Sequence, residues 1–282
     1  MSNKKISRPV IFVGIIFIII FILVGGIIAS CMFFTNYTSA KKELFIAIKE
    51  NDIAAVSEII EKYPSLVNCE RNLIGIFGNS TPLITAIARG HDDIAKLLIE
   101  NNANVNKLCY SSPIIEAVAR GNYDMAWYLI EKGADVTVVD STASKRTFIF
   151  SIVSWRIKEG DEEREKEQFK LFKYALEQGA TTEPSRARYL GISNVLGLAA
   201  CYNNRLIVEY ILDQNMYDIN GRVTETDKTP LICAVHLQAY NTCEVLIQRG
   251  ADLSLKDSYG KTAYDYAVEL NDERLINILS EQ

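Results

Sequence analysis

The chain has few of the residues, and none of the short motifs, on which common catalytic and metal sites depend. Only two of its 282 residues are histidine and six are cysteine, with no HxxxH or CxxC pair. GxSxG, P-loop and GxGxxG motifs are absent as well, so hydrolase, nucleotide-hydrolysing and dinucleotide-binding sites lack their residues. The cysteine spacing fits neither a disulfide framework nor a zinc ribbon. The sequence therefore predicts no enzyme activity, no metal and no cofactor.

The chain also lacks a surplus of positive charge. It has 30 Lys and Arg against 35 Asp and Glu, which gives a net charge of −5. Non-specific nucleic-acid binding needs a broad positive field, so nucleic acid is not an expected partner. Proline is scarce too, at six residues, whereas 49% of the residues are hydrophobic. This composition is typical of a chain that folds around a buried core, and not of a disordered or collagen-like chain.

One segment lacks charge altogether. Residues 10–34 contain no Asp, Glu, Lys or Arg. As a helix they would extend about 37 Å, which exceeds the roughly 30 Å hydrocarbon core of a bilayer. Lys4, Lys5 and Arg8 precede this segment, so the positive-inside rule predicts a cytoplasmic N-terminus and places the rest of the chain across the membrane.

This interpretation divides the chain into three parts. We expect residues 1–34 to be a membrane anchor, residues 35–41 a short polar linker and residues 42–282 a folded domain. Removal of residues 1–31 leaves 27 basic and 35 acidic residues, a net charge of −8, so the outer domain is acidic. The Ile-rich and Lys/Asn-rich composition favours a bacterial source, which would place this domain in the periplasm.

A lipoprotein signal is the alternative for the N-terminal segment. Residues 28–31, Ile-Ala-Ser-Cys, resemble a lipobox, in which Cys31 would be lipidated and become the new N-terminus. The apolar stretch before Cys31 is long for a cleaved signal, and residues 32–34 continue it past the cleavage point. An uncleaved anchor is therefore favoured, and both interpretations tether the domain to a membrane.

A unit of about 33 residues recurs after the apolar run. Thr-Pro-Leu-Ile-Thr-Ala at 81–86 returns as Ser-Pro-Ile-Ile-Glu-Ala at 112–117 and as Thr-Pro-Leu-Ile-Cys-Ala at 229–234. These units resemble ankyrin repeats, in which TPLxxA opens the first helix and GH separates the two helices. The resemblance covers roughly residues 42–282 and implies an all-α ankyrin-repeat solenoid of about seven helical hairpins. Their aligned core positions are Ala47, Ala86, Ala117, Ile152, Ala199, Ala234 and Ala267.

The residue chemistry supports this register. Four positions after most core residues stands Gly or Asn, the residue types that best tolerate the left-handed backbone of a tight turn. Arg156 and Gln238 depart from this rule, so we expect their two turns to close differently. Thr or Ser before Pro82, Pro113 and Pro230 predicts a hydroxyl N-cap followed by proline at the first helical position. Each hairpin is too small to bury its apolar face alone, so neighbours must stack.

Insertions interrupt the repeat in three places. The charged residues 158–167 lengthen the fourth unit, and their helical composition predicts an extended hairpin with solvated faces; a partner-binding excursion is the alternative. Residues 182–191 lengthen the connection to the fifth unit. The loop at residues 72–79 is unusually apolar, and it would either cap the first unit or contact a partner.

The resemblance also implies a binding surface, because ankyrin proteins form a concave face from their turn fingers and first helices. Side chains three positions after each core residue should face this groove. They are Glu50, Arg89, Arg120, Trp155, Tyr202, Leu237 and Leu270. Arg, Trp and Tyr are enriched among binding hot spots, so we predict that Arg89, Arg120, Trp155 and Tyr202 bind a partner. For Trp155 and Tyr202, the alternative is that they cover the enlarged fourth hairpin.

The sequence thus predicts a membrane-tethered ankyrin repeat protein that binds another protein. The resemblance allows two roles, an envelope scaffold or an immunity protein that blocks a toxin. An enzyme or a small-ligand carrier on the same scaffold is the alternative. Neither a small-molecule substrate nor a particular partner is indicated by the sequence.

Overall fold

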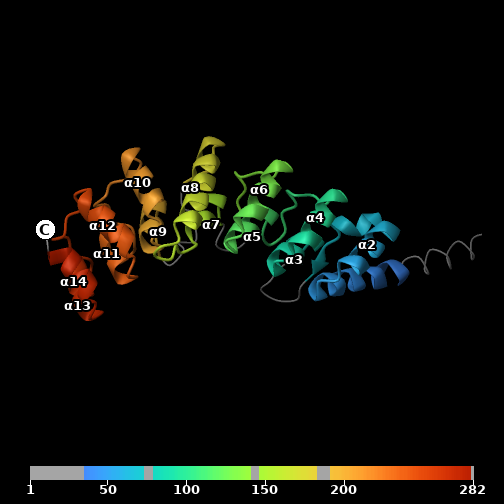
Figure 1. Ribbon diagram of the computed structural model, residues 1–282, viewed down its shortest axis with the longest axis horizontal. Coiled ribbons are helices and arrows are strands. Elements are labelled where there is room, and N and C mark those ends of the chain that lie inside the picture. The colour runs from blue at the N-terminus through green and yellow to red at the C-terminus, as the bar shows by residue number, and fades with distance from the viewer. Residues whose placement is uncertain (1–34, 73–78, 141–145, 183–190, 281–282) are drawn as a thin grey trace, which may run out of the picture.

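A computed structural model describes residues 35–72, 79–140, 146–182 and 191–280, which form a row of stacked helical hairpins (Figure 1). The predicted membrane segment, including Cys31, lies outside the described residues, as do the tip of the apolar loop and most of residues 182–191. Within the described ranges, no helix is both long and apolar enough to cross a membrane.

Seven hairpins follow one another along the described chain. The first consists of helical backbone over residues 35–50 and helix α2, and a 3-10 turn and a two-stranded antiparallel ladder connect it to the second. The elements are α2 (Ile53–Lys62), η1 (Pro64–Asn68), β1 (Arg71–Asn72), β2 (Asn79–Ser80), α3 (Pro82–Arg89), α4 (Asp92–Glu100), α5 (Pro113–Ala119), α6 (Tyr123–Glu131), α7 (Phe148–Val153), α8 (Glu162–Glu177), α9 (Val195–Cys201), α10 (Arg205–Asp213), α11 (Pro230–His236), α12 (Tyr240–Gln248), α13 (Ala263–Glu269) and α14 (Glu273–Ser280).

The first helix of each repeat begins where the sequence predicts. The Thr81 hydroxyl accepts the backbone N–H of Ile84 at 3.1 Å, and Ser112 and Thr229 cap α5 and α11 in the same way. Proline is the first helical residue in all three, where its missing N–H costs no hydrogen bond. Thr147 caps α7 without a proline.

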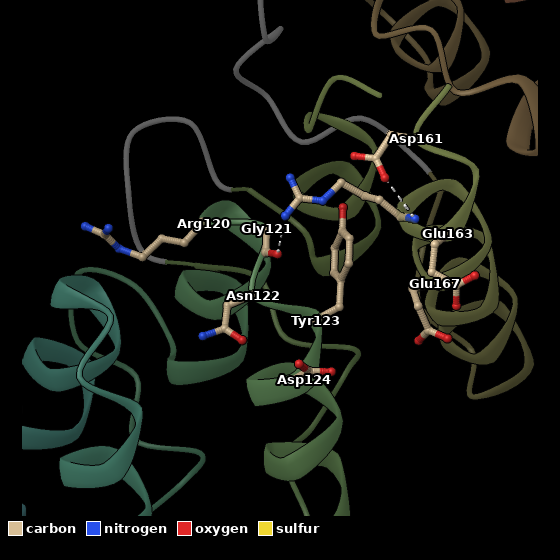
Figure 2. Close-up of a pocket in the computed structure, with 9 residues that line it drawn as sticks. Arg120, Gly121, Asn122, Tyr123, Asp124, Asp161, Glu163 and Glu167 are labelled. Carbon is tan, nitrogen blue, oxygen red and sulfur yellow. Dashed lines mark hydrogen bonds between the residues drawn. The ribbon is translucent and has the colours of Figure 1, made fainter. Parts of the chain in front are cut away.

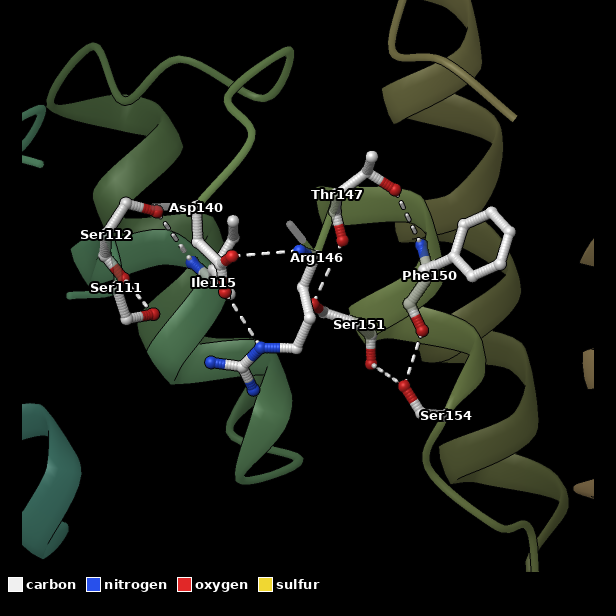
Figure 3. A network of polar contacts seen from close by, with 9 residues as sticks. All are labelled: Ser111, Ser112, Ile115, Asp140, Arg146, Thr147, Phe150, Ser151 and Ser154. Carbon is white, nitrogen blue, oxygen red and sulfur yellow. Dashed lines mark hydrogen bonds and ion pairs between the residues drawn. The ribbon is translucent and has the colours of Figure 1, made fainter. Parts of the chain in front are cut away.

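Figure 3 shows the contacts at the base of the finger before α7, the loop that connects the third hairpin to the fourth. The carboxylate of Asp140 accepts the backbone N–H and the Nε–H of Arg146, each at 2.8 Å. Asp140 is 3% exposed, and a buried carboxylate is stable when paired and hydrogen-bonded in this manner. This ion pair fixes the base of the finger next to the N-cap of α7.

The turns inside the hairpins largely follow the Gly/Asn prediction. Asn51, Gly90, Gly121, Asn203 and Asn271 all have positive φ, between 52° and 73°. In each, the next residue donates its N–H to the carbonyl of the core alanine, as His91 does to Ala86 at 3.0 Å.

The expectation for Gln238 was wrong, and that for Arg156 is confirmed. Gln238 has a φ of 53°, because the bond from the Ala239 N–H to the Ala234 carbonyl at 2.8 Å imposes the same backbone on a less suited residue. The Gln238 amide also donates to the carboxylate of Asp272 at 2.9 Å. Arg156 has no positive φ, since α7 ends earlier and the chain leaves the repeat pattern there.

The core runs along the whole row. First helices stack in the order α3, α5, α7, α9, α11 and α13, while α6, α8, α10, α12 and α14 form part of the second layer. The predicted core positions from the second to the seventh hairpin are all fully buried. Five of these six are alanine, whose small side chain allows close helix packing, so the hairpins form one elongated domain with a continuous core.

The predicted polar linker is helical instead. Residues 35–50 form helical backbone, and Ala40 within the predicted 35–41 linker is 5% exposed. The Tyr37 ring packs edge-on against Tyr63 of the first hairpin, with centroids 6.3 Å apart. An apolar stripe at helical spacing therefore outweighs the polar residues of this segment.

The insertion in the fourth hairpin lengthens α8 to 16 residues, against nine in α4 and α6. The lengthened hairpin is confirmed, but one face of α8 is buried and not solvated. Gln168 is fully buried and donates to the carbonyls of Ile152 at 2.7 Å and Trp155 at 3.0 Å. Buried Glu165 accepts the backbone N–H of Leu206 at 3.1 Å. The insertion thus joins the fourth hairpin to the fifth.

Residues 154–161, which we call the strap, connect α7 to α8 within the fourth hairpin and contact the three hairpins that follow it. The Ile157 N–H donates to the Tyr202 carbonyl at 3.0 Å in the fifth hairpin. Arg156 donates to the carbonyls of Leu237 and Gln238, at 2.7 and 3.0 Å, in the sixth. Glu159 forms a 2.8 Å ion pair with Arg274 in the seventh. The strap therefore follows the turn edge from the fourth hairpin to the last.

Candidate functional site

The inner face of the row is lined by first helices and by fingers, the loops that connect one hairpin to the next. Figure 1 shows α3, α5, α9, α11 and α13 along one edge and α4, α6, α8, α10 and α12 along the other, and both ends of the row curve toward the side of the first helices. The first helices therefore line the concave face, and two hollows lie on it.

The first hollow, here called the arginine hollow, lies between the second and third hairpins and has a volume of about 500 Å³. Ser80 and Tyr110 from two successive fingers line one side. Thr85, Arg89 and Arg120, from α3 and the end of α5, line the other. Two of the four predicted site residues thus meet in one concave site.

Both guanidinium groups of this hollow remain accessible. Arg89 ends α3 and is exposed, and its guanidinium forms no ion pair or hydrogen bond with any residue in the described ranges. Arg120 lies 3.4 Å from Glu116 one turn earlier, with 47% of its side chain exposed. An exposed pair of this spacing contributes only about 0.3–0.5 kcal/mol. Arg120 can therefore exchange Glu116 for a carboxylate of a ligand.

Acidic residues gather on the far side of Arg120, where Asp124, Asp161, Glu163 and Glu167 line a surface hollow of about 470 Å³. In Figure 2 the Arg120 side chain points away from these carboxylates. A different arginine, Arg164, lies among them. Arg120 therefore lines both hollows, with its guanidinium directed away from the four carboxylates.

The second hollow, here called the thiol hollow, lies between the fifth and sixth hairpins and has a volume of about 360 Å³. It is bounded like the first, by fingers on one side and the first helices α9 and α11 on the other. Its apolar lining comes from Ile192, Cys201, Cys233 and Leu237. Both cysteines are 3% exposed.

Burial shifts the pKa of two ionisable groups of the thiol hollow, Cys201 and His236. A hydrogen bond with Cys233, together with burial, raises the pKa of the Cys201 thiol far above its ordinary value. Burial and the neighbouring Lys228 ammonium lower the pKa of His236, so its imidazole is neutral at pH 7. Lys228 itself lies 2.8 Å from the His236 Nδ1 and 4.5 Å from the centre of the Tyr266 ring. The hollow thus combines an apolar base with one cation, Lys228, and one carboxylate, Glu225, in its lining.

The family model for ankyrin repeats in three copies matches residues 44–140, 165–257 and 196–282. The chain is an ankyrin repeat protein. The crystal structure of the human ASB11 ankyrin repeat domain is similar to it, with a TM-score of 0.59 and 21% sequence identity over 84% of this chain and 95% of that one. At this identity the likeness shows the shared fold alone. No curated protein matches the sequence.

Trp155 of this ankyrin repeat protein packs against the turn of the third hairpin. A Cβ placed on Gly121 would lie 2.8 Å from the Trp155 ring. The Arg164 guanidinium lies 5.4 Å from the same ring centre and donates to the Gly121 carbonyl at 3.4 Å. Because α7 ends at Val153, Trp155 belongs to the strap and not to a helix face. These contacts favour the covering role over a free binding anchor.

Tyr202 also lies at the strap. It is the residue after the last turn of α9, its side chain is partly buried against the core, and its carbonyl accepts the Ile157 N–H. The ankyrin repeat protein therefore brings Arg89 and Arg120 together, whereas Trp155 and Tyr202 lie near the middle of the row and outside the arginine hollow. The predicted continuous stripe of four residues is interrupted where the repeat carries its insertion.

The thiol hollow is the part of the concave face that the sequence did not indicate. Cys201, Cys233 and Cys243 lie in helices and are buried, as is typical of small apolar side chains. The possible signal was Leu237, which shares the register of Arg89 and Arg120. Within the described ranges no group of three or more His, Cys, Asp or Glu side chains could hold a metal ion.

Proposed function

We propose that this ankyrin repeat protein is a membrane-tethered binding module that holds another protein on its concave face, as an envelope scaffold or as an immunity protein. Residues 10–34 would lie in the membrane and the repeats on the periplasmic side. Because ankyrin repeats are generally protein interaction modules, the family favours a protein as the ligand.

The arginine hollow is the observation that carries this proposal. Arg89 and Arg120 stand at the same register of neighbouring hairpins, exposed, on a domain that is otherwise acidic. Tyr110, with 41% of its surface exposed, lies beside them. Exposed Arg and Tyr side chains around a concave site are typical of the centre of a protein interface.

Site-specific photocrosslinking in native membranes tests the proposal. A photoreactive phenylalanine analogue at Tyr110 should give one discrete protein adduct, whereas the same analogue at Lys96, exposed on the outer helix α4, should not. The Tyr110 adduct should weaken strongly when Arg89→Ala and Arg120→Ala are combined. Equal adducts from both positions, or an adduct that ignores both arginines, would show that the concave face is not the binding surface.

The membrane part of the proposal needs its own test. A reporter that is active only outside the cytoplasm, fused after Gln282, should be active. Cys31→Ala should leave membrane association and acyl labelling unchanged if the segment is an uncleaved anchor. A stable but inactive fusion would reverse the orientation, and loss of acyl labelling would favour the lipoprotein alternative.

A further inference from the structure

The arginine hollow and the thiol hollow occupy equivalent places at two positions along one concave face. Each lies between a pair of adjacent hairpins, with finger residues on one side and first-helix residues on the other. Arg89 and Arg120 in one hollow and Leu237 in the other stand at the same register of their repeats. A single extended ligand lying along the groove would therefore meet both hollows.

The arginine hollow selects for negative charge. Its two guanidinium groups are accessible, and only Glu116 among its lining residues carries a negative charge. Arginine donates two parallel hydrogen bonds to a carboxylate and is always charged. The domain has a net charge of −8, so an acidic ligand would be repelled elsewhere and attracted here. Charge complementarity thus points to an Asp or Glu side chain.

The thiol hollow favours an apolar side chain, because its two charged lining residues, Lys228 and Glu225, have opposite signs and the surface around Leu237 is apolar. Leu237 is 36% exposed, while Ile192, Cys201 and Cys233 lie beneath the surface around it. Thiols behave as small, polarisable apolar groups. Covering this patch with an apolar side chain would remove the Leu237 surface from water, which is favourable by the hydrophobic effect.

The distance between the hollows fixes the spacing of the two side chains. Helix α5, which carries Arg120 at its end, is followed in the stack by α7, α9 and then α11, which ends next to Leu237. Three stacking steps of roughly 8–10 Å correspond to about 25–30 Å. An extended peptide covers this distance with about eight or nine residues.

We propose, building on the protein-binding function above, that the groove takes one extended acidic-apolar segment of its partner. An Asp or Glu of that segment enters the arginine hollow, and an apolar side chain about eight or nine residues away enters the thiol hollow.

The test uses the full chain in lipid nanodiscs and a displayed library of random peptides of about 16 residues, long enough to span both hollows. Bound peptides are then synthesised and titrated against the wild type and three variants. The double variant Arg89→Glu/Arg120→Glu reverses the charge of the first hollow, and Leu237→Glu places a charge beside the second. Lys96→Glu on α4 is the matched charge-change control.

We expect the selected peptides to combine an acidic residue and an apolar residue at the stated spacing. Their affinity should fall about tenfold or more with either groove variant and stay unchanged with Lys96→Glu. Replacing the acidic residue of the peptide by Lys should restore binding to Arg89→Glu/Arg120→Glu. Insertion of four residues between the acidic and the apolar residue should reduce the affinity to that of a peptide that has only one of them. Circular dichroism and melting confirm that each variant is folded.

The outcomes separate this proposal from the function on which it rests. Peptides that lose affinity with Leu237→Glu but ignore the charge of the arginines would overturn the acidic-apolar assignment and leave the groove intact. Peptides whose affinity depends only on the arginines, at any spacing, would overturn the assignment of the thiol hollow as the site of the apolar side chain. If no selected peptide distinguishes the wild type from the groove variants, the concave-face function itself fails.

Discussion

Gly121 and Gly90 occupy the same turn position in neighbouring hairpins but differ in what surrounds them. Their φ values are 68° and 73°. A Cβ on Gly121 would meet the Trp155 ring at 2.8 Å, whereas nothing lies within 4 Å of a Cβ on Gly90. We expect Gly90→Ala to cost about 1 kcal/mol, from backbone strain alone. Gly121→Ala should cost clearly more in urea denaturation, because the aromatic ring must also move.

The same pair of variants measures the packing of Trp155. If the Trp155 ring rests on the turn, Trp155→Ala should reduce the extra cost of Gly121→Ala. The double variant should then lose less unfolding free energy than the two single variants lose together. Equal stabilities of Gly90→Ala and Gly121→Ala would mean that the Trp155 ring does not pack on the Gly121 turn. Trp155 would then again be a candidate for partner binding.

The hydrogen bonds that Asp257 accepts predict how the stability of the last hairpin depends on pH. The Asp257 carboxylate accepts the N–H groups of Tyr259 and Lys261, at 2.9 and 3.0 Å, and the hydroxyl of Tyr266 at 2.6 Å. Burial alone would raise the pKa of this carboxyl, but the hydrogen bonds outweigh burial and lower it. A lowered carboxyl pKa stabilises the fold above the unfolded value of about 3.9, and this contribution disappears as the pH falls through the folded pKa.

Asp257→Asn should therefore cost about 2 kcal/mol at pH 7, the range of hydrogen bonds to charged groups, and the difference from the wild type should shrink below about pH 4. Urea denaturation at several pH values measures both. Glu58→Gln, an exposed carboxylate on α2, is the control and should change stability by under about 0.5 kcal/mol. A penalty that persists unchanged at pH 3 would contradict the ionic origin.

At the scale of elements, the strap closes the end of α11. Helix C-termini leave unpaired carbonyls with partial negative charge, and Arg156 donates to two carbonyls there. Arg156→Ala should cost about 1–2 kcal/mol and raise hydrogen exchange in α11, while α3 and α5 keep their protection. Arg156→Lys should recover only part, because an ammonium cannot bridge both carbonyls in a planar fork. Loss of protection spread evenly along the row would argue against this local role.

The elements also show which features a single sequence can predict. Hydroxyl caps, proline positions, core alanines and most turn residues depend on neighbours within one hairpin, so the repeat pattern predicted them. Gln238 was missed because a backbone bond made by Ala239 forces its conformation. The helix over residues 35–41 was not predicted because most side chains of this segment are polar, and its buried Ala40 and half-buried Tyr37 give too weak an apolar pattern.

At the scale of the molecule, the structure keeps the register of the predicted positions but not their continuity, and their binding role stays a prediction. Arg89 and Arg120 meet because regular repeats keep equal positions aligned. Trp155 leaves the pattern because α7 ends two residues before it. The strap joins residues up to 115 positions apart, and such pairings leave no periodic signal in the sequence. The thiol hollow was hidden because its cysteines also serve as core residues.

The strap should make the last four hairpins unfold together. In a simple repeat array each unit contacts only its neighbours, so parts can unfold separately. Both tryptophans, Trp127 and Trp155, lie in the third and fourth hairpins, so fluorescence reports that region while circular dichroism reports all helices. In the wild type the two urea curves should coincide. In Arg156→Ala/Glu159→Ala the circular dichroism curve should fall first, because the C-terminal hairpins lose their tie.

Lys166→Ala, an exposed position of α8 outside the strap, is the control and should keep the two curves together. Coincident curves in the strap variant would show that nearest-neighbour stacking alone couples the hairpins.

The same strap bears on how the protein would respond to mechanical load. A solenoid pulled from its two ends is expected to peel one hairpin at a time from the terminus, in short extension steps. Here the seventh and sixth hairpins are clamped to the fourth through Glu159 and Arg156, so tension applied at the C-terminus reaches the middle of the row directly. In a force–extension record the C-terminal hairpins should rupture as one long step, after which the second and third hairpins unravel singly.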